Sequence, residues 1–191
     1  MPYIQNALSF TIETLLGLYL IIVILRFMFQ LFQVDFRNPV SQMVVMLTNF
    51  PLKFLRQFIP GLFGIDVASI ALALAIGFAK ISLLLTLSGI PFNFPGTLVL
   101  AVAEILNISV WILIIAILAS AVLSWVAPRS HNPATRIVAG ISEPALRPFR
   151  RMIPAMSGID LSPLLALLVL NLVQRLIVHP VADFGKGLII Q

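Results

Sequence analysis

Long apolar runs alternate with polar segments along this chain, and the lengths of the runs predict four membrane-spanning helices. The runs cover residues 8–32, 66–87, 97–126 and 161–178. At about 1.5 Å per residue, each run is long enough to cross a hydrocarbon layer of roughly 30 Å. The uncharged segment 88–96 separates the second run from the third, and its two prolines and two glycines do not continue a helix. The pattern therefore predicts an all-α membrane protein.

The polar segments repeat with an offset of 94 residues. Residues 38–39, Asn-Pro, return at 132–133, and the segment 56–66 returns with related residues at 150–160. Each copy lies between two apolar runs, which predicts two tandem, parallel repeats of helix, basic amphipathic loop and helix. The predicted repeats are residues 1–90, with the loop 33–65, and residues 91–191, with the loop 127–160.

Composition and charge agree with this class. Hydrophobic residues make up 60% of the 191 residues and charged residues 10%, which is too apolar for a single soluble core. The net charge is +5, and eight of the 12 basic residues fall in the two loops, so the charge indicates membrane topology and not a nucleic-acid partner. By the positive-inside rule the loops face the cytoplasm, and both termini and segment 88–96 face outward. No basic region precedes the first run, so we expect it to remain as a helix.

Each loop is predicted to hold amphipathic helix in the membrane interface, because apolar residues recur at helical spacing opposite basic ones. Asn132 followed by Pro133 is a typical helix start, whereas Pro144 and Pro148 are expected to break or kink the second loop and Pro51 the first. Two interpretations stay open: a collar that packs the bundle and binds anionic lipid, or a docking surface for an acidic cytoplasmic partner. The basic residues that either would use are Arg37, Lys53, Arg56, Arg136, Arg147, Arg150 and Arg151.

Two aspartates, Asp66 and Asp160, begin the second and fourth runs. A carboxylate at a helix start accepts backbone N–H bonds and favours the positive end of the helix dipole. Both are predicted to be helix caps, with ligand binding as the alternative.

Charged residues inside the apolar runs are the main candidates for function, because each costs at least about 2.5 kcal/mol near the bilayer centre and normally faces the bundle interior. Lys80 and Arg175 occupy matching depths, and Glu13 and Glu104 enter from the opposite surface. We expect the acids to pair with the bases, either to fix helix register or to form a polar path for an ion, a proton or a small solute. Arg26 is expected to be an anchor that extends toward the interface. The predicted intramembrane cluster comprises Glu13, Lys80, Glu104, Asn107, Asn171, Gln174 and Arg175.

The sequence offers no catalytic or metal-binding pattern. It contains no cysteine, and His131 and His179 have neither metal-ligand spacing nor a catalytic partner; both are expected at the interface. Ser82 and Lys80 fall on different helix faces, which argues against a Ser/Lys dyad. We therefore expect no catalytic residue, no metal and no cofactor.

Small residues of the second run form two stripes, 71/75/79 and 73/77, which favour close helix packing within the chain over dimerisation. Four helices leave no room for a wide pore, so a homo-oligomer would be needed to build one.

The repeated residues resemble the YggT family over nearly the whole chain. The first copy carries Arg26, Asn38-Pro39, Arg56, Ile59-Pro60 and 64–66; the second, which matches most fully, carries 123–125, Asn132-Pro133, Glu143-Pro144, Arg147-Pro148, Arg150-Arg151, Ile153-Pro154 and 158–163. The copies differ at several positions: Ser120 stands where the first copy has Arg26, and Gln30-Leu31 stands where the second has Ser124-Trp125. Roles in one copy therefore do not transfer to the other.

This resemblance implies a small integral protein of the bacterial cytoplasmic membrane. Members of the family are linked with osmotic stress tolerance and cation homeostasis, the YlmG branch with cell division or envelope shape, and plastid relatives with cofactor attachment and nucleoid distribution. Two functions follow: a non-enzymatic scaffold or assembly factor that uses the basic loops, or a conduit for potassium, another cation or a small solute that uses the intramembrane cluster. The candidate partners are anionic lipid head groups, a cytoplasmic or membrane protein, and further copies of the chain.

Overall fold

The computed structural model describes residues 2–61, 64–126, 132–152 and 160–190, and the regular elements in these ranges are all helical. Four helical stretches in this part of the chain are long and apolar enough to cross a membrane: Tyr3–Leu31, Val67–Leu87, Phe94–Val126 and Ser162–Ile190. The predicted all-α membrane fold is confirmed. The elements are α1 (Pro2–Leu31), α2 (Pro39–Leu55), α3 (Val67–Leu87), α4 (Phe94–Val126), α5 (Pro133–Met152), α6 (Ser162–Val173), the π-helical turn η1 (Gln174–Val178) and α7 (His179–Ile190).

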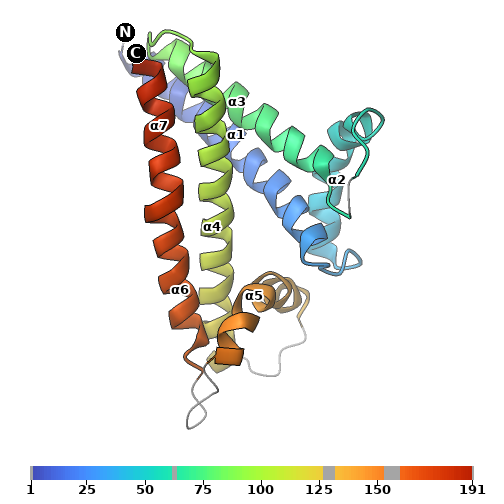
Figure 1. Cartoon of the computed structure of the whole chain (residues 1–191). Helices are drawn as coiled ribbons and strands as arrows, with labels where there is room; N and C mark the ends of the chain where they lie inside the picture. Colours follow the sequence, from blue (N-terminus) through green and yellow to red (C-terminus); the bar gives the residue numbers. More distant parts are fainter. Residues whose placement is uncertain (1, 62–63, 127–131, 153–159, 191) are drawn as a thin grey trace.

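The long helices form two pairs that follow the same order in each repeat. In Figure 1, α4 runs beside the continuous helix of α6, η1 and α7, while α1 and α3 form a second pair that leans away from the first. The two chain ends lie together at one end of the molecule. The amphipathic helices α2 and α5 each lie at the end of their helix pair that is remote from the two chain ends (Figure 1). We call α2 and α5 together the collar.

Apolar packing joins the collar to the membrane helices and the two repeats to each other. Leu52 of α2 is fully buried against α1, in a cluster that also contains Leu20 and Leu72. A second cluster crosses between repeats, with Phe29 of α1 beside Ile141 of α5. Asn38 also donates from Nδ2 to the carbonyl oxygen of Pro133 at 2.6 Å, so the equivalent starts of α2 and α5 touch. The collar is therefore part of the core.

The prolines of the collar do not interrupt its helices, so the breaks predicted at Pro51 and Pro144 were wrong, while the kink predicted at Pro148 stays a prediction. α2 continues through Pro51, and α5 through Pro144 and Pro148. A proline leaves the carbonyl four residues earlier without its usual helical donor. In α2 that carbonyl belongs to Leu47, and the hydroxyl of Tyr19 donates to it from α1 at 3.5 Å. Tertiary packing thus compensates for the missing backbone bond.

The fourth long helix also continues past its predicted end, and the first begins before its predicted start. α1 starts at Pro2, not at residue 8, and the C-terminal helix runs to Ile190, not to residue 178. Pro180 follows the predicted end and is a residue that usually breaks a helix, but η1 precedes it, and the N–H of His179 reaches the carbonyl of Gln174 across the wider turn. A π-helical turn changes which carbonyls need donors and so lets the helix pass a proline. His179 therefore lies within the helix, not at its end.

Small residues allow the helices to approach closely, but only one of the two predicted stripes of small residues lies at a helix contact. A Cβ added at Gly77 would lie 3.5 Å from the Cβ of Ala101, so α3 meets α4 along the stripe of residues 73 and 77. Ala75 and Ala79 are exposed, so the expectation that the stripe 71/75/79 packs within the chain was wrong. Near the chain ends, a Cβ at Gly96 would lie 2.6 Å from the side chain of Ile189. The α4–α7 contact was not predicted.

Candidate functional site

An arginine at the end of α2 is joined to the aspartate that precedes α3. Arg56 occupies the C-cap position of α2, and its Nη2 lies 2.5 Å from Oδ2 of Asp66. The same carboxylate oxygen accepts a hydrogen bond from the hydroxyl of Ser69 at 2.6 Å. Asp66 is only 5% exposed, so the ion pair is shielded on the carboxylate side. Asp66 stands at the N-cap position of α3 as predicted, but its side chain makes no capping bond to the helix backbone; it is half of an ion pair that holds the collar to α3.

The second repeat builds the same pair at positions 94 residues later. Nε of Arg150 donates to Oδ2 of Asp160 at 2.9 Å, and Oδ1 of this aspartate accepts from the backbone N–H of Ser162 at 2.9 Å. Here the arginine has a second acid, because its Nη1 lies 2.5 Å from Oε2 of Glu143. All three charged side chains are at least one-third exposed. The two pairs therefore match in position and differ in burial and charge.

The pairs keep both aspartates ionised. Burial raises the pKa of Asp66, but the hydrogen bonds from Arg56 and Ser69 lower it by more than burial raises it. The pKa of Asp66 therefore lies below its usual value. The pKa of Asp160 is also lowered, because the bonds from Ser162 and Arg150 outweigh burial. Burial lowers the pKa of Arg150, but the bonds to Asp160 and Glu143 raise it above its usual value. Both lowered pKa values favour the carboxylate form of the aspartate.

A pocket lies beside each pair, and the two pockets are lined by equivalent positions. The first pocket has a volume of about 660 Å³ and the second about 650 Å³. Four pairs of lining residues correspond between the repeats: Arg26 and Ser120, Gln30 and Ser124, Arg56 and Arg150, Asp66 and Asp160. The duplicated unit therefore has a duplicated hollow where its collar helix meets its two membrane helices.

Arg26 distinguishes the first pocket from the second. Its side chain was expected to extend toward the interface as an anchor, but it is buried, with 8% of the residue exposed, and it lines the first pocket. The guanidinium carbon lies 5.5 Å from the centre of the Phe36 ring, a cation–π contact. The first pocket thus holds two arginines and one aspartate. In the second, Ser120 replaces the buried arginine and Glu143 adds a negative charge to Arg150.

The predicted intramembrane cluster divides into separate contacts. Lys80 and Glu104 form an ion pair between α3 and α4, and Nε2 of Gln174 donates to Oδ1 of Asn107 at 3.2 Å. Glu13 and Arg175 are exposed, and neither has an ion-pair partner among the residues that the structure describes. The expectation that acids pair with bases therefore holds for Lys80 and Glu104 and was wrong for Glu13 and Arg175.

The remaining polar positions do not connect these contacts. Asn171 is exposed and bonds to the carbonyl of Leu167 within its own helix. A pocket of about 330 Å³, lined by Glu104, Asn107 and His179 among others, lies beside α4 and α7. Among the described residues no group of three or more His, Asp or Glu side chains could hold a metal ion, and His131 lies outside them.

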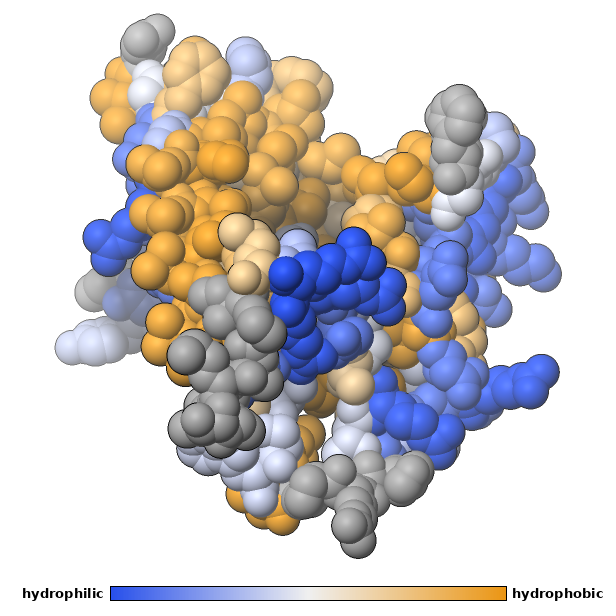
Figure 2. All heavy atoms as spheres, turned by 60° about the horizontal axis from the view of Figure 1, so that its bottom comes forward, coloured by the Kyte–Doolittle hydropathy of each residue, from blue (hydrophilic) through white to orange (hydrophobic). Residues whose placement is uncertain are grey.

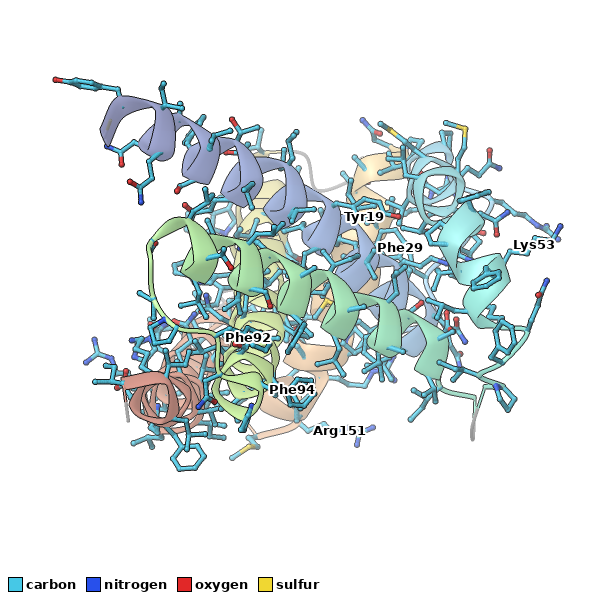
Figure 3. The ribbon with its side chains drawn as sticks, turned by 90° about the horizontal axis from the view of Figure 1, so that it is seen from above. Tyr19, Phe29, Lys53, Phe92, Phe94 and Arg151 are labelled. Atoms are coloured by element: carbon cyan, nitrogen blue, oxygen red, sulfur yellow. The ribbon has the colours of Figure 1, made fainter. Side chains whose placement is uncertain are left out.

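The collar presents basic and apolar side chains outward. In Figure 2, which turns this end toward the viewer, hydrophilic atoms gather over part of the face beside hydrophobic atoms of the helices. Lys53 and Arg151 extend away from the bundle (Figure 3). The other basic residues predicted for the loops, Arg37, Arg56, Arg136, Arg147 and Arg150, are exposed as well. The large apolar residues exposed along and just after α2 include Met43, Met46, Phe50, Phe54 and Phe58.

Sequence reasoning missed the ion pairs although their signal was present. Arginine and aspartate recur ten residues apart in both copies, at 56 and 66 and at 150 and 160. Two opposite charges kept at one spacing in a duplicated unit favour a contact between them. The burial of Arg26 had no such signal, because it depends on how α2 and Phe36 cover the end of α1.

Comparisons with known proteins agree with the duplication. A family model described as CCB3/YggT matches residues 5–87 and again residues 99–181, two segments offset by the same 94 positions. An uncharacterized protein of Pseudomonas aeruginosa is 39% identical over 183 residues, which cover 94% of this chain and 92% of that protein. The uncharacterized protein YggT of Escherichia coli K12 is 32% identical over 186 residues, 97% of this chain and 96% of that protein. An uncharacterized protein of Vibrio alginolyticus is 35% identical over 162 residues, 84% of this chain and 87% of that protein. No solved structure matches the chain.

Proposed function

The chain belongs to the CCB3/YggT family, and we propose that it acts as a non-enzymatic membrane scaffold or assembly factor. In this proposal the protein lies in the bacterial cytoplasmic membrane, with the collar in the cytoplasm and both chain ends on the outer side. Its role would serve the envelope, cell division or osmotic homeostasis. The observation that carries the proposal is the collar, which is fixed to the core and exposes basic and apolar side chains together.

A fixed collar supports binding because little order has to be gained when a partner arrives. The Asn38–Pro133 hydrogen bond joins α2 to α5, and the two Arg–Asp pairs join each collar helix to the following membrane helix. Leu52 of α2 and Leu146 of α5 are buried on the inner side of the collar. The surface is therefore held in one arrangement by contacts on its inner side.

The exposed side of the collar suits an anionic membrane surface. Basic residues attract anionic head groups by about 1 kcal/mol each near the surface. The exposed phenylalanines and methionines of the first collar helix can enter the boundary between head groups and acyl chains. An acidic protein partner that lies at the membrane would meet the same combination of charge and apolar surface.

The alternative, a conduit for a cation or small solute, has less support. A path would need polar groups connected across the bundle, whereas Lys80 is neutralised by Glu104 and Arg175 is exposed. Asn107 and Gln174 bond to each other and form a separate pair. These contacts are typical of polar residues that fix the register of neighbouring helices.

The two functions can be separated by testing rescue of an osmotic or division defect in a strain that lacks the protein. One variant neutralises the outer collar (Lys53→Gln, Arg136→Gln, Arg147→Gln), and the other neutralises the membrane pair (Lys80→Gln, Glu104→Gln). Membrane abundance is matched by immunoblotting. A scaffold predicts that the collar variant loses rescue while the pair variant keeps it; the reverse result would refute the proposal.

A further inference from the structure

The guanidinium of Arg26 has hydrogen-bond donors that no described residue satisfies. Its Nε and Nη1 atoms are buried and have no hydrogen-bond partner, and only 8% of the residue is exposed. A buried donor without a partner is destabilising, and more so on a charged group. Arginine presents five N–H donors in a planar fork, so two unmatched atoms leave a large part of its bonding capacity unused. Such a group favours an anionic ligand.

The surrounding side chains do not supply that anion. Asp66 is the acid that lines the same pocket, and its carboxylate bonds to Arg56 and Ser69. Phe36 lies 5.5 Å from the guanidinium carbon and offers a ring, not an acceptor atom. The first pocket therefore contains one positive charge in excess, and Arg26, which lines it, has two buried donor atoms without a partner.

Position and lining indicate the class of ligand. Arg26 lies five residues before the end of α1 at Leu31, about 7.5 Å along the helix axis. For a membrane helix this depth falls near the boundary between hydrocarbon and head groups. Val45, Met46 and Ile59 also line the pocket and provide apolar surface next to the charge. A phosphate group carried on a small polar or amphipathic molecule matches both features.

We propose that the first pocket binds a phosphate group through the guanidinium of Arg26, either the head group of an anionic phospholipid or a free phosphate ester. Guanidinium and phosphate form paired, charge-assisted hydrogen bonds in a planar geometry that lysine does not reproduce. Arg56, held by Asp66 at the rim, adds a second positive group. The proposal goes beyond the scaffold function, because it assigns a ligand to one pocket and rests on Arg26, which is buried and not one of the outward side chains of the collar.

The second pocket is an internal comparison. It has nearly the same volume and the same Arg–Asp pair, but Ser120 takes the place of Arg26, and Arg150 is held by two acids. The charges that line it, on Arg150 and Asp160, sum to zero, whereas those that line the first pocket sum to a positive value. Only the first repeat is therefore expected to bind phosphate.

The test measures the thermal unfolding midpoint of the full-length protein in neutral detergent micelles as a probe is titrated. The probes are phosphatidylglycerol, soluble glycerol phosphate, and potassium chloride at matched ionic strength. Arg26→Gln removes the charge, and Arg26→Met replaces the side chain with an apolar one of similar length. Lys186→Gln is the matched control, since it removes one positive charge from an exposed residue far along the chain.

We expect the probe to raise the midpoint of wild type and of Lys186→Gln, and the half-saturating concentration to rise at least about tenfold in Arg26→Gln. Without probe, Arg26→Met should unfold at a higher temperature than wild type, which a purely structural arginine would not show. A shift with phosphatidylglycerol alone assigns the site to a lipid head group, and a shift with both probes shows that the phosphate ester suffices. No shift with either probe, or shifts in both Arg26 variants equal to that of wild type, would overturn the proposal. The assay does not depend on the collar's cellular role, so such a failure would leave the scaffold function standing.

Discussion

Replacing Asp66 by asparagine should destabilise the protein far more than the equivalent change at Asp160. In the first repeat the carboxylate is 5% exposed and has one arginine partner, which is 37% exposed. The substitution Asp66→Asn would remove the negative charge, set an amide donor near Nε of Arg56, and leave two arginines at one pocket. A lost charge-assisted bond together with a partly buried unpaired charge costs about 2–3 kcal/mol, below the value for a fully buried pair because water reaches Arg56.

The change Asp160→Asn should cost about 1 kcal/mol or less, because the pair is exposed and screened by water. Arg150 also keeps its bond to Glu143, and asparagine caps the following helix about as well as aspartate. The assay is equilibrium unfolding of both variants in the same micelles, monitored by circular dichroism. Equal losses of unfolding free energy, or a larger loss for Asp160→Asn, would refute the reasoning from burial.

Three further predictions follow from the same contacts. Because the pKa of Asp66 is lowered in the folded protein, its stabilising effect is complete above the unfolded-state pKa of about 3.9 and is lost as the pH falls through the lower folded value. Asp66→Asn should therefore weaken the fall of the unfolding free energy at acid pH, measured by unfolding at a series of pH values. Lys80→Met should destabilise the protein by about 2–4 kcal/mol by leaving Glu104 unpaired, and adding Glu104→Leu should recover most of the loss; no recovery in thermal unfolding would show that the pair is not the cause. Gly96→Ala should cost about 1–3 kcal/mol, because the new methyl group would meet Ile189 and the Gly185 carbonyl, whereas Gly187→Ala, with open space around it, is the control and should not destabilise.

The membrane helices and their duplication could be predicted because both are recorded directly in the order of residues. Apolar run length fixes a spanning helix, and a constant offset of motifs fixes a repeat. Helix ends were less predictable where proline was involved. Pro51 and Pro180 are local signals for a break, but a tyrosine on another helix and a π-helical turn compensate for them. Neither compensation can be inferred from neighbouring residues.

The site was less predictable because height along a helix does not specify direction around it. Lys80, Glu104, Glu13 and Arg175 were placed together by depth alone. The first two face each other across the contact between repeats, while Glu13 and Arg175 face outward. Arg26 was misjudged for a related reason: its depth suits an anchor, but α2 and Phe36 cover it.

The claim that the protein works through its collar and not through a path across the membrane is tested most directly by ion flux. Purified protein would be reconstituted in liposomes, and potassium, sodium and proton flux would be measured beside protein-free liposomes and a folded Glu104→Gln variant. If the protein works through its collar, wild-type flux equals the protein-free background for all three ions. Flux above background that disappears in Glu104→Gln would contradict it and make the membrane pair part of a conduit.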